Sequence, residues 1–284
     1  MDCPILVWML SYNRSLTQEE YDQCYQTLRQ CVPHAQVPYA TPQNQEFVRQ
    51  MIAYILPLLM MRHRRISRLK WRDNCTPNGK RWIEQLPDHP MDTRVRAMIG
   101  YHLAYEANLV GMVMTQGRQR EVVNIGLGIK QLCHPPDTPV PVYVESLYHK
   151  LTRLEISFCS PPQPDDVILR RVCLLLALKQ AYIKAIGQPI GFDWSRLEFS
   201  PEENVAKGDG IVLKGWEFRI WQAHIQIMHD DESIEEHLYQ CACAFYRGND
   251  SVKFIWQKDR KDLDSWVQFL TVDQLMSVLP KLTD

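Results

Sequence analysis

The chain has 284 residues, of which 45% are hydrophobic, and its formal net charge at pH 7 is −1. This composition is sufficient for the core of one large domain or two smaller ones, and the near-neutral charge argues against a general nucleic-acid or membrane-surface binder. The nine cysteines form no CxxC pair, which favours reduced thiols in a cytoplasmic protein.

Neither the start of the chain nor its most apolar run is typical of a targeting or membrane-spanning segment. No basic region precedes the short apolar stretch at residues 5–10. The apolar run at residues 51–61 is well below the roughly 20 residues that span a bilayer. We therefore expect a soluble, cytoplasmic protein in which residues 51–61 form a buried helix.

The first elements are expected to be one strand and two helices. Residues 5–10 have the composition of a strand. Thr17 and Glu20 have the spacing of a capping box, which predicts a helix over residues 17–31. A second helix is expected over residues 45–67, kinked or split at Pro57.

The middle of the chain combines turn and strand signals. Asn78-Gly79 marks a turn. Residues 108–114 and 122–129 are predicted to be strands joined by a hairpin loop at residues 116–118. Residues 144–156 have the apolar spacing of a helix.

The C-terminal part is expected to contain one long helix and then mostly strands. Asp165 and Asp166 are predicted to cap the long helix, which ends at Gly187. The later elements are a hairpin at residues 211–227, strands at 237–246 and 252–256, and a helix at 272–282. The order predicts two α+β halves, residues 1–121 and 122–284, although no internal sequence repeat is visible.

The long helix carries the most specific motif of the chain. Its segment Lys179-Gln180-Ala181-Tyr182-Ile183-Lys184-Ala185-Ile186-Gly187 resembles the hallmark W-x-x-K-E-[AS]-x-x-K-A-x-G of the 4′-phosphopantetheinyl transferases. These enzymes transfer phosphopantetheine from coenzyme A to a serine of a carrier protein. The resemblance implies two similar α+β halves about a pseudo-twofold axis, with coenzyme A in the cleft between them. Two further segments resemble the fungal members: residues 71–81 and residues 101–110.

Compared with this family, four acidic positions have changed. Gly126-Leu127-Gly128-Ile129-Lys130 falls on the family motif G-[IV]-D-[IVL]-[EM], so that Gly128 replaces the aspartate that binds magnesium and Lys130 occupies the second site. The acids of the F-x-S-x-x-E segment and of the long helix become Gln163 and Gln180. Magnesium needs oxygen ligands in near-octahedral geometry. We therefore expect no metal site and a severely weakened parent reaction.

The same comparison suggests which residues line the cleft. His102 and Tyr105 replace the asparagine and histidine of the fungal segment, although His102 is the family histidine if the register is shifted. We predict that Tyr105 or His102 donates or shuttles a proton, assisted by Gln180 and Lys184. The alternatives remain that both are packed strand residues and that Lys184 is a surface residue. The predicted substrate-binding cleft contains Gly128, Lys130, Gln163, Leu176 and Lys179.

Three functions follow as hypotheses. The first is a metal-independent natural-product cyclase or isomerase, of pericyclic or proton-transfer type, that acts on an apolar small molecule in fungal secondary metabolism such as polyketide assembly. It requires no cofactor. The second is a divergent phosphopantetheinyl transferase that uses coenzyme A and magnesium with relocated ligands such as Glu106, Glu121 or Glu145. The third is a non-catalytic pseudoenzyme that binds an acyl carrier protein or a synthase. No nucleic-acid or membrane partner is expected.

Overall fold

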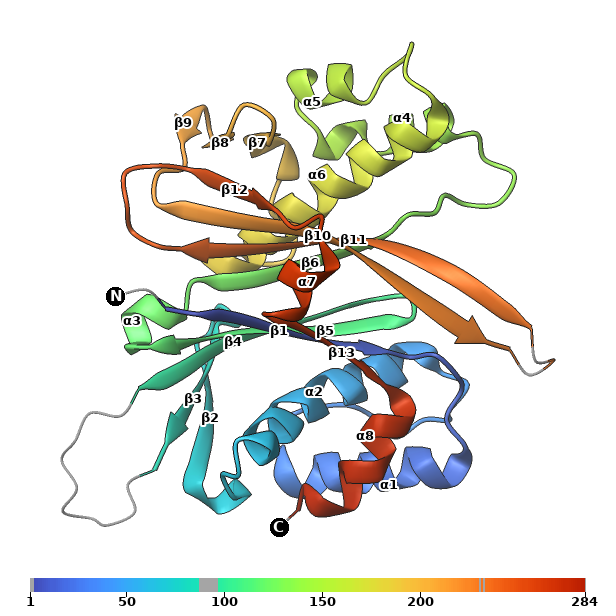
Figure 1. Ribbon diagram of the computed structural model, residues 1–284, viewed down its shortest axis with the longest axis vertical. Coiled ribbons are helices and arrows are strands. Elements are labelled where there is room, and N and C mark those ends of the chain that lie inside the picture. The colour runs from blue at the N-terminus through green and yellow to red at the C-terminus, as the bar shows by residue number, and fades with distance from the viewer. Residues whose placement is uncertain (1–2, 87–96, 230, 232, 284) are drawn as a thin grey trace.

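The computed structural model describes residues 3–86, 97–229, 231 and 233–283 of a mixed α+β protein (Figure 1). Its elements form two main sheets and one small sheet. Within the described residues, no helix combines the length and the apolar character needed to cross a membrane. No disulfide bond joins any of the nine cysteines, all of which lie within these residues.

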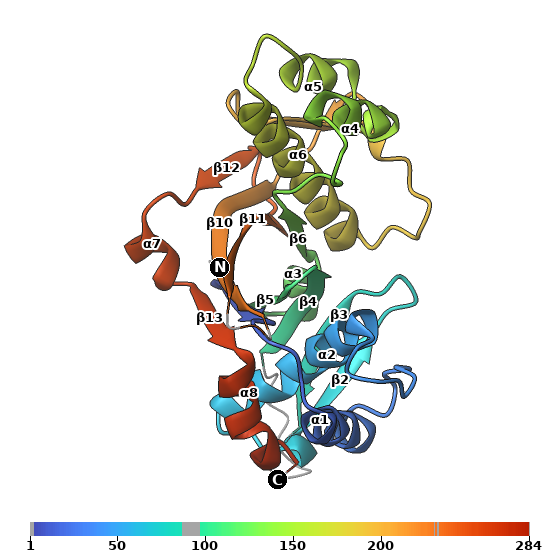
Figure 2. The ribbon, with the colours of Figure 1, turned by 90° about the vertical axis from the view of Figure 1, so that its right-hand side faces the viewer.

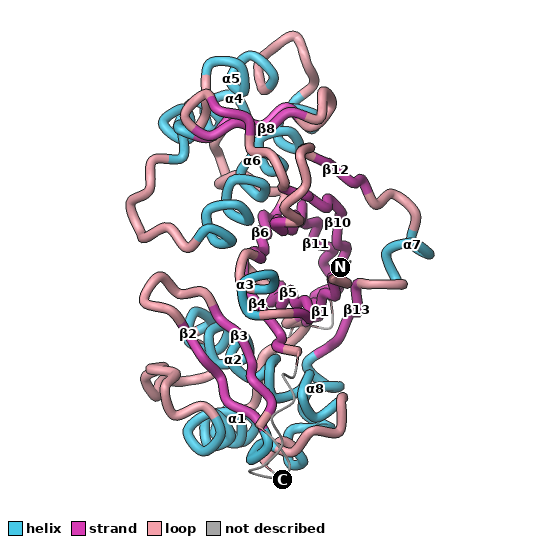
Figure 3. Tube along the Cα trace, turned by 90° about the vertical axis from the view of Figure 1, so that its left-hand side faces the viewer, coloured by secondary structure: helices cyan, strands magenta, loops and turns pink. Residues whose placement is uncertain are grey.

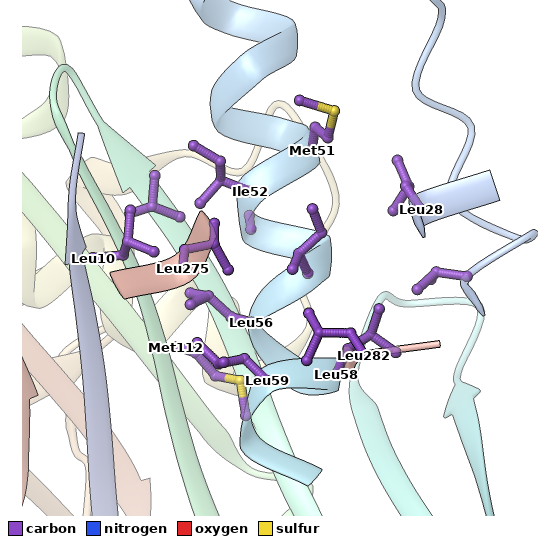
Figure 4. Packing of buried hydrophobic residues seen from close by; sticks show 14 of the residues in the cluster. Leu10, Leu28, Met51, Ile52, Leu56, Leu58, Leu59, Met112, Leu275 and Leu282 are labelled. Atoms are coloured by element: carbon purple, nitrogen blue, oxygen red, sulfur yellow. The ribbon is translucent and has the colours of Figure 1, made fainter. Parts of the chain in front are cut away.

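The first sheet has the strand order β13-β1-β5-β4-β3-β2. Its strands are β1 (Ile5–Ser11), β2 (Trp71–Cys75), β3 (Arg81–Gln85), β4 (Met98–Glu106), β5 (Leu109–Gly117) and β13 (Val267–Thr271). Helices α1 (Gln18–Cys31), α2 (Gln45–His63) and α8 (Val272–Val278) pack against it. Figure 4 shows part of this core, in which Leu10 and Met112 of the sheet meet Ile52, Leu56 and Leu59 of α2.

Several predictions for this half are confirmed. The capping box before α1 is present, because the Thr17 hydroxyl accepts from the Glu20 backbone N–H at 3.2 Å and the Glu20 carboxylate accepts from the Thr17 N–H at 2.9 Å. Helix α2 continues through Pro57 but ends at His63, four residues before the predicted end. Buried side chains on the turns around Pro57 stabilise the helix despite the missing donor.

The second sheet has the order β12-β10-β11-β6, and the long helix α6 (Asp165–Ile186) packs on one of its faces. Its strands are β6 (Ile125–Gln131), β10 (Trp216–Met228), β11 (Ile234–Tyr246) and β12 (Lys253–Trp256). The small sheet consists of β7 (Leu197–Ser200), β8 (Val205–Gly208) and β9 (Ile211–Val212). As predicted, α6 ends at Gly187, which adopts a left-handed φ of 72°.

Four sequence predictions for the second half need correction. Residues 116–118 do not form a hairpin, because the short helix α3 (Gln119–Val122) carries the chain from the first sheet to the second. Residues 211–227 are not a hairpin either, since β10 is one long strand that pairs with β11. The predicted helix at residues 144–156 is broken into α4 (Val140–Ser146), a 3-10 turn and α5 (Arg153–Phe158). Asp165 and Asp166 lie in the first turn of α6 and do not cap it.

The two main sheets share a hydrophobic layer. It contains Val7 and Met9 of β1, Leu127 of β6 and Tyr239 of β11. Seen from the side, the strands of the two main sheets form a ring, and the connection from β12 through α7 (Arg260–Asp264) to β13 passes outside it (Figures 2 and 3). The two main sheets share one feature of strand order. In the first sheet β1 lies next to β5, the second strand of the β4–β5 hairpin, and in the second sheet β6 lies next to β11, the second strand of the β10–β11 hairpin.

The last elements of the chain return to the first sheet. After α7 (Arg260–Asp264), strand β13 pairs in parallel with β1, with Val267 opposite Val7. Helix α8 then adds Leu275 and Leu282, the latter just beyond its end, to the core of the first sheet. In the division expected at residue 121 these residues belong to the C-terminal half; in the structure they pack against the first sheet.

Candidate functional site

The candidate site lies along the edge of β6 that does not pair with β11. Two backbone N–H groups on this edge donate to side chains that the sequence singled out. The Leu127 N–H donates to His102 Nδ1 of β4 at 3.3 Å, and the Ile129 N–H donates to Gln180 Oε1 of α6 at 3.1 Å. Both side chains therefore satisfy donors of an edge strand that would otherwise lack partners.

Lys130, the residue after Ile129 on β6, forms an ion pair with Glu106 of β4. Lys130 Nζ lies 3.2 Å and 3.1 Å from the two carboxylate oxygens of Glu106. The Lys130 side chain is 23% exposed and that of Glu106 is 33% exposed, so both groups are reachable from solvent. Cys133 and Tyr143 are close enough for Glu106 to affect them, and burial together with nearby charges raises the pKa of Tyr143 to about 12.

Gly128 does not face an open cleft. A Cβ atom added there would lie 2.0 Å from the Ala177 carbonyl oxygen of α6, and one added at Gly126 would lie 2.1 Å from that of Ala181. The two glycines let β6 pack directly on the helix backbone. The aspartate that the family motif places at this position cannot be accommodated without moving the helix.

His102 is neutral in this environment. Removal from water lowers its pKa to about 3, and the positive charges of Lys184 and Arg81 act in the same direction. Since Nδ1 accepts a hydrogen bond, we assign the proton to Nε2. A neutral imidazole offers no positive charge for a phosphate group.

This shift predicts a pH-dependent stability. The pKa of His102 in the folded protein lies below its value of about 6.5 in the unfolded chain. As the pH drops through 6.5, the unfolded chain therefore binds a proton that the folded protein does not, and the free energy of unfolding decreases. We expect His102 to account for a loss of about 2 kcal/mol between pH 7 and pH 5. Urea denaturation at both pH values should show this loss in the wild type and in the His224→Gln control, but not in His102→Gln. Equal pH dependence in all three proteins would contradict it.

Tyr105 lies on the opposite face of β4 from His102. Its hydroxyl donates to Glu46 of α2 at 2.9 Å, and its ring packs against the core of the first sheet. Alternation along the strand places His102 and Glu106 on the face toward β6 and Tyr105 on the face toward α2. The structure therefore does not bring Tyr105 to the candidate site.

Lys179 is also separate from the site, although it precedes Gln180. Its ammonium and the Glu155 carboxylate lie 2.6 Å apart, and both side chains are completely buried. Lys179 also donates to the carbonyls of Lys150, Trp194 and Leu197 at 2.7 to 3.0 Å. Lys179 thus joins α6 to the segments before and after it.

The remaining predicted residues are spread along α6 and the loop before it. Leu176 is buried in the core of the second sheet. Gln163 is exposed in the loop before the helix. Lys184 is exposed, yet near enough for its charge to act on His102. Of the predicted set, the structure brings His102, Lys130 and Gln180 together at the β6 edge.

Magnesium does not fit the side chains at this edge. Gly128 provides no ligand, Lys130 provides a positive charge, and the Gln180 oxygen already accepts from Ile129. No cluster of three or more His, Cys, Asp or Glu side chains suited to a metal ion occurs among the described residues. Glu106 is the one carboxylate described at this edge, and it is paired with Lys130.

The sequence comparison agrees with the motif resemblance. No family model matches the chain. The chain is 28% identical over 181 residues to 4′-phosphopantetheinyl transferase pptA of Paxillus involutus, and the match covers 62% of this chain and 66% of the relative. The matched region is thus slightly under two thirds of the relative's length. This distant similarity supports a relationship to the phosphopantetheinyl transferase superfamily.

Proposed function

We propose that this chain has the phosphopantetheinyl transferase fold but acts without magnesium, as a natural-product cyclase or isomerase on a small apolar molecule. The observation that carries the proposal is the Glu106–Lys130 pair, two residues along β6 from Gly128. The proposal includes two similar α+β halves about a pseudo-twofold axis, with the substrate cleft between them. The matching positions of β1 beside β5 and of β6 beside β11 support this arrangement.

The pair suits proton-transfer chemistry. The Glu106 carboxylate can remove a proton from a carbon next to a carbonyl group, and the Lys130 ammonium can donate a hydrogen bond to the oxygen on which negative charge develops. Returning the proton from Glu106 to another carbon of the same molecule completes an isomerisation. Gln180 and His102 position the strand that carries Lys130, since each accepts from its backbone.

Replacing Glu106 tests this role. We expect Glu106→Gln to lower turnover by about 100-fold or more, because the amide cannot accept the proton. The substrate source is a metabolite extract from host cells that lack the gene, and product formation is followed by mass spectrometry. Glu46→Gln, which alters a carboxylate on the other side of β4, is the matched control and should retain activity. Loss of wild-type activity on adding a chelator, or full activity of Glu106→Gln, would contradict the proposal.

The similarity to pptA favours a second candidate, a divergent transferase acting on a carrier protein. Lys80, in the segment at residues 71–81 that resembles the fungal members, points the same way: its ammonium donates to Asn124 Oδ1 at 2.5 Å, directly before β6. Incubation of an apo carrier protein with coenzyme A and magnesium decides between the two functions. A carrier that gains the mass of the phosphopantetheine arm supports the transferase. Stable binding of the carrier without any mass gain supports the pseudoenzyme alternative.

A further inference from the structure

A groove of about 1120 Å³ lies between the edge of β10 and strand β13, away from the candidate site. Its walls are the far part of β10, strand β13 and the connecting segment 257–264, which we call the strap. Neither Glu106 nor Lys130 lines this groove. Figure 2 shows the strap with α7 standing outside the ring of strands. The volume is slightly above the range usual for small-molecule pockets.

One wall of the groove is an unpaired strand edge. Strand β10 runs to Met228, but β12 pairs with it only from Glu217 to Ile220. At the last paired position the Ile220 carbonyl accepts from the Gln257 N–H. The backbone N–H and C=O of Ile220 therefore point outward, that is, away from β11. The Met228 N–H also points outward and donates to the Asn13 carbonyl at 2.9 Å.

Between these two points, three residues direct their backbone groups to the same edge. Backbone groups of a strand alternate in direction, so the N–H and C=O groups of Gln222, His224 and Gln226 point outward, as those of Ile220 and Met228 do. All three residues line the groove. No strand pairs with this stretch of β10 among the described residues.

The unpaired stretch of β10 itself provides no protection against pairing. The charged residues of the groove belong to the strap (Lys258, Asp259, Arg260 and Asp264) and to β11 (Glu236). Natural edge strands are commonly blunted by charged residues, proline or bulges. Residues 221–228 read Trp-Gln-Ala-His-Ile-Gln-Ile-Met, without lysine, arginine, acid or proline. This stretch pairs continuously with β11 on its other side, without a bulge.

We propose that the groove binds an extended peptide segment of a partner protein, which adds to the β10 edge as a strand. The outward N–H and C=O groups of the β10 edge alternate along the strand, so a matching ligand must present acceptors and donors in the same alternation. An extended peptide backbone has this pattern. Trp256 is 42% exposed and Phe269 is 38% exposed in this groove, so apolar side chains at every second position would be buried against them. The strap closes the outer side, which favours a single chain over the edge of a second copy.

The test uses the full-length protein and an array of uncharged octapeptides with apolar residues at alternate positions. Peptides that bind are measured by fluorescence anisotropy against two variants. Gln226→Pro removes one outward N–H while leaving the β11 ladder intact, because proline is tolerated at strand edges. Gln226→Ala changes the same side chain and keeps the N–H. We expect at least a tenfold loss of affinity for Gln226→Pro and less than a twofold change for Gln226→Ala.

A second measurement keeps the test decisive if Gln226→Pro fails to fold. Methylating alternate backbone nitrogens of the peptide should abolish binding to the wild type, while methylating the intervening ones should not. The proposal is overturned if no peptide binds, or if neither set of methylations weakens binding. It is also overturned if small apolar compounds or a second copy of the chain occupy the groove in place of peptides.

Discussion

Replacing Lys179 with methionine is expected to lower the free energy of unfolding by about 3–5 kcal/mol. The substitution removes the buried ammonium and leaves the Glu155 carboxylate without its charged partner. Burial raises the pKa of Glu155, and loss of the pairing would raise it further. The carbonyls that Lys179 now contacts would also lose a donor. Urea denaturation at pH 7 measures the effect.

Two further variants separate the ion pair from general effects on the helix. Lys184→Met, at an exposed position of α6, should change stability by less than about 0.5 kcal/mol. The double variant Lys179→Met with Glu155→Leu should recover only part of the loss. No buried charge remains, but the N–H groups of Thr152 and Phe199 lose the carboxylate that accepts from them. A loss below 1 kcal/mol for Lys179→Met alone would show that the pair is not structural.

Restoring the family's aspartate at position 128 is expected to destabilise the protein by about 3 kcal/mol or more. The new Cβ would meet the Ala177 carbonyl at 2.0 Å, and backbone atoms cannot rotate away as a side chain can. A buried carboxylate adds a desolvation cost. Thermal unfolding with and without millimolar magnesium measures both effects.

Gly128→Ala is the matched control for this substitution. It introduces the same Cβ clash without a charge, so it should lose about 1–3 kcal/mol. Neither variant should be stabilised by magnesium. If Gly128→Asp is as stable as the wild type, or if magnesium raises its melting temperature, β6 and α6 separate more easily than the packing indicates.

Local sequence signals predicted the elements that are stabilised locally. The helix from Asp165 to Ile186 is long and apolar and ends in a glycine that adopts a positive φ. The capping box at Thr17 is equally local. Strand β13 gave no such signal, because its five residues are stabilised by pairing with β1 at the other end of the chain. Strands β2 and β3 pair with each other across the turn at Asn78-Gly79, and the sequence predicted the turn but not the two short strands.

The candidate site was predictable only in part. Gln180 and Lys130 were found because a family motif marks their positions, and the structure places both at the β6 edge. Tyr105 was expected beside His102, although residues an odd number apart on a strand point to opposite faces. That alternation could have indicated Glu106, which shares the face of His102. The Glu155 partner of Lys179 lies 24 positions earlier and gave no local signal.

The return of the last residues to the first sheet has a consequence for synthesis. Strand β13 borders β1, and α8 completes the core built on α1 and α2. Residues 267–282 are synthesised long after the strands and helices whose core they complete, so that core cannot close until they have emerged from the ribosome. Contacts this distant in sequence slow folding. We expect removal of residues 267–283 to expose the apolar core and to leave an aggregation-prone chain.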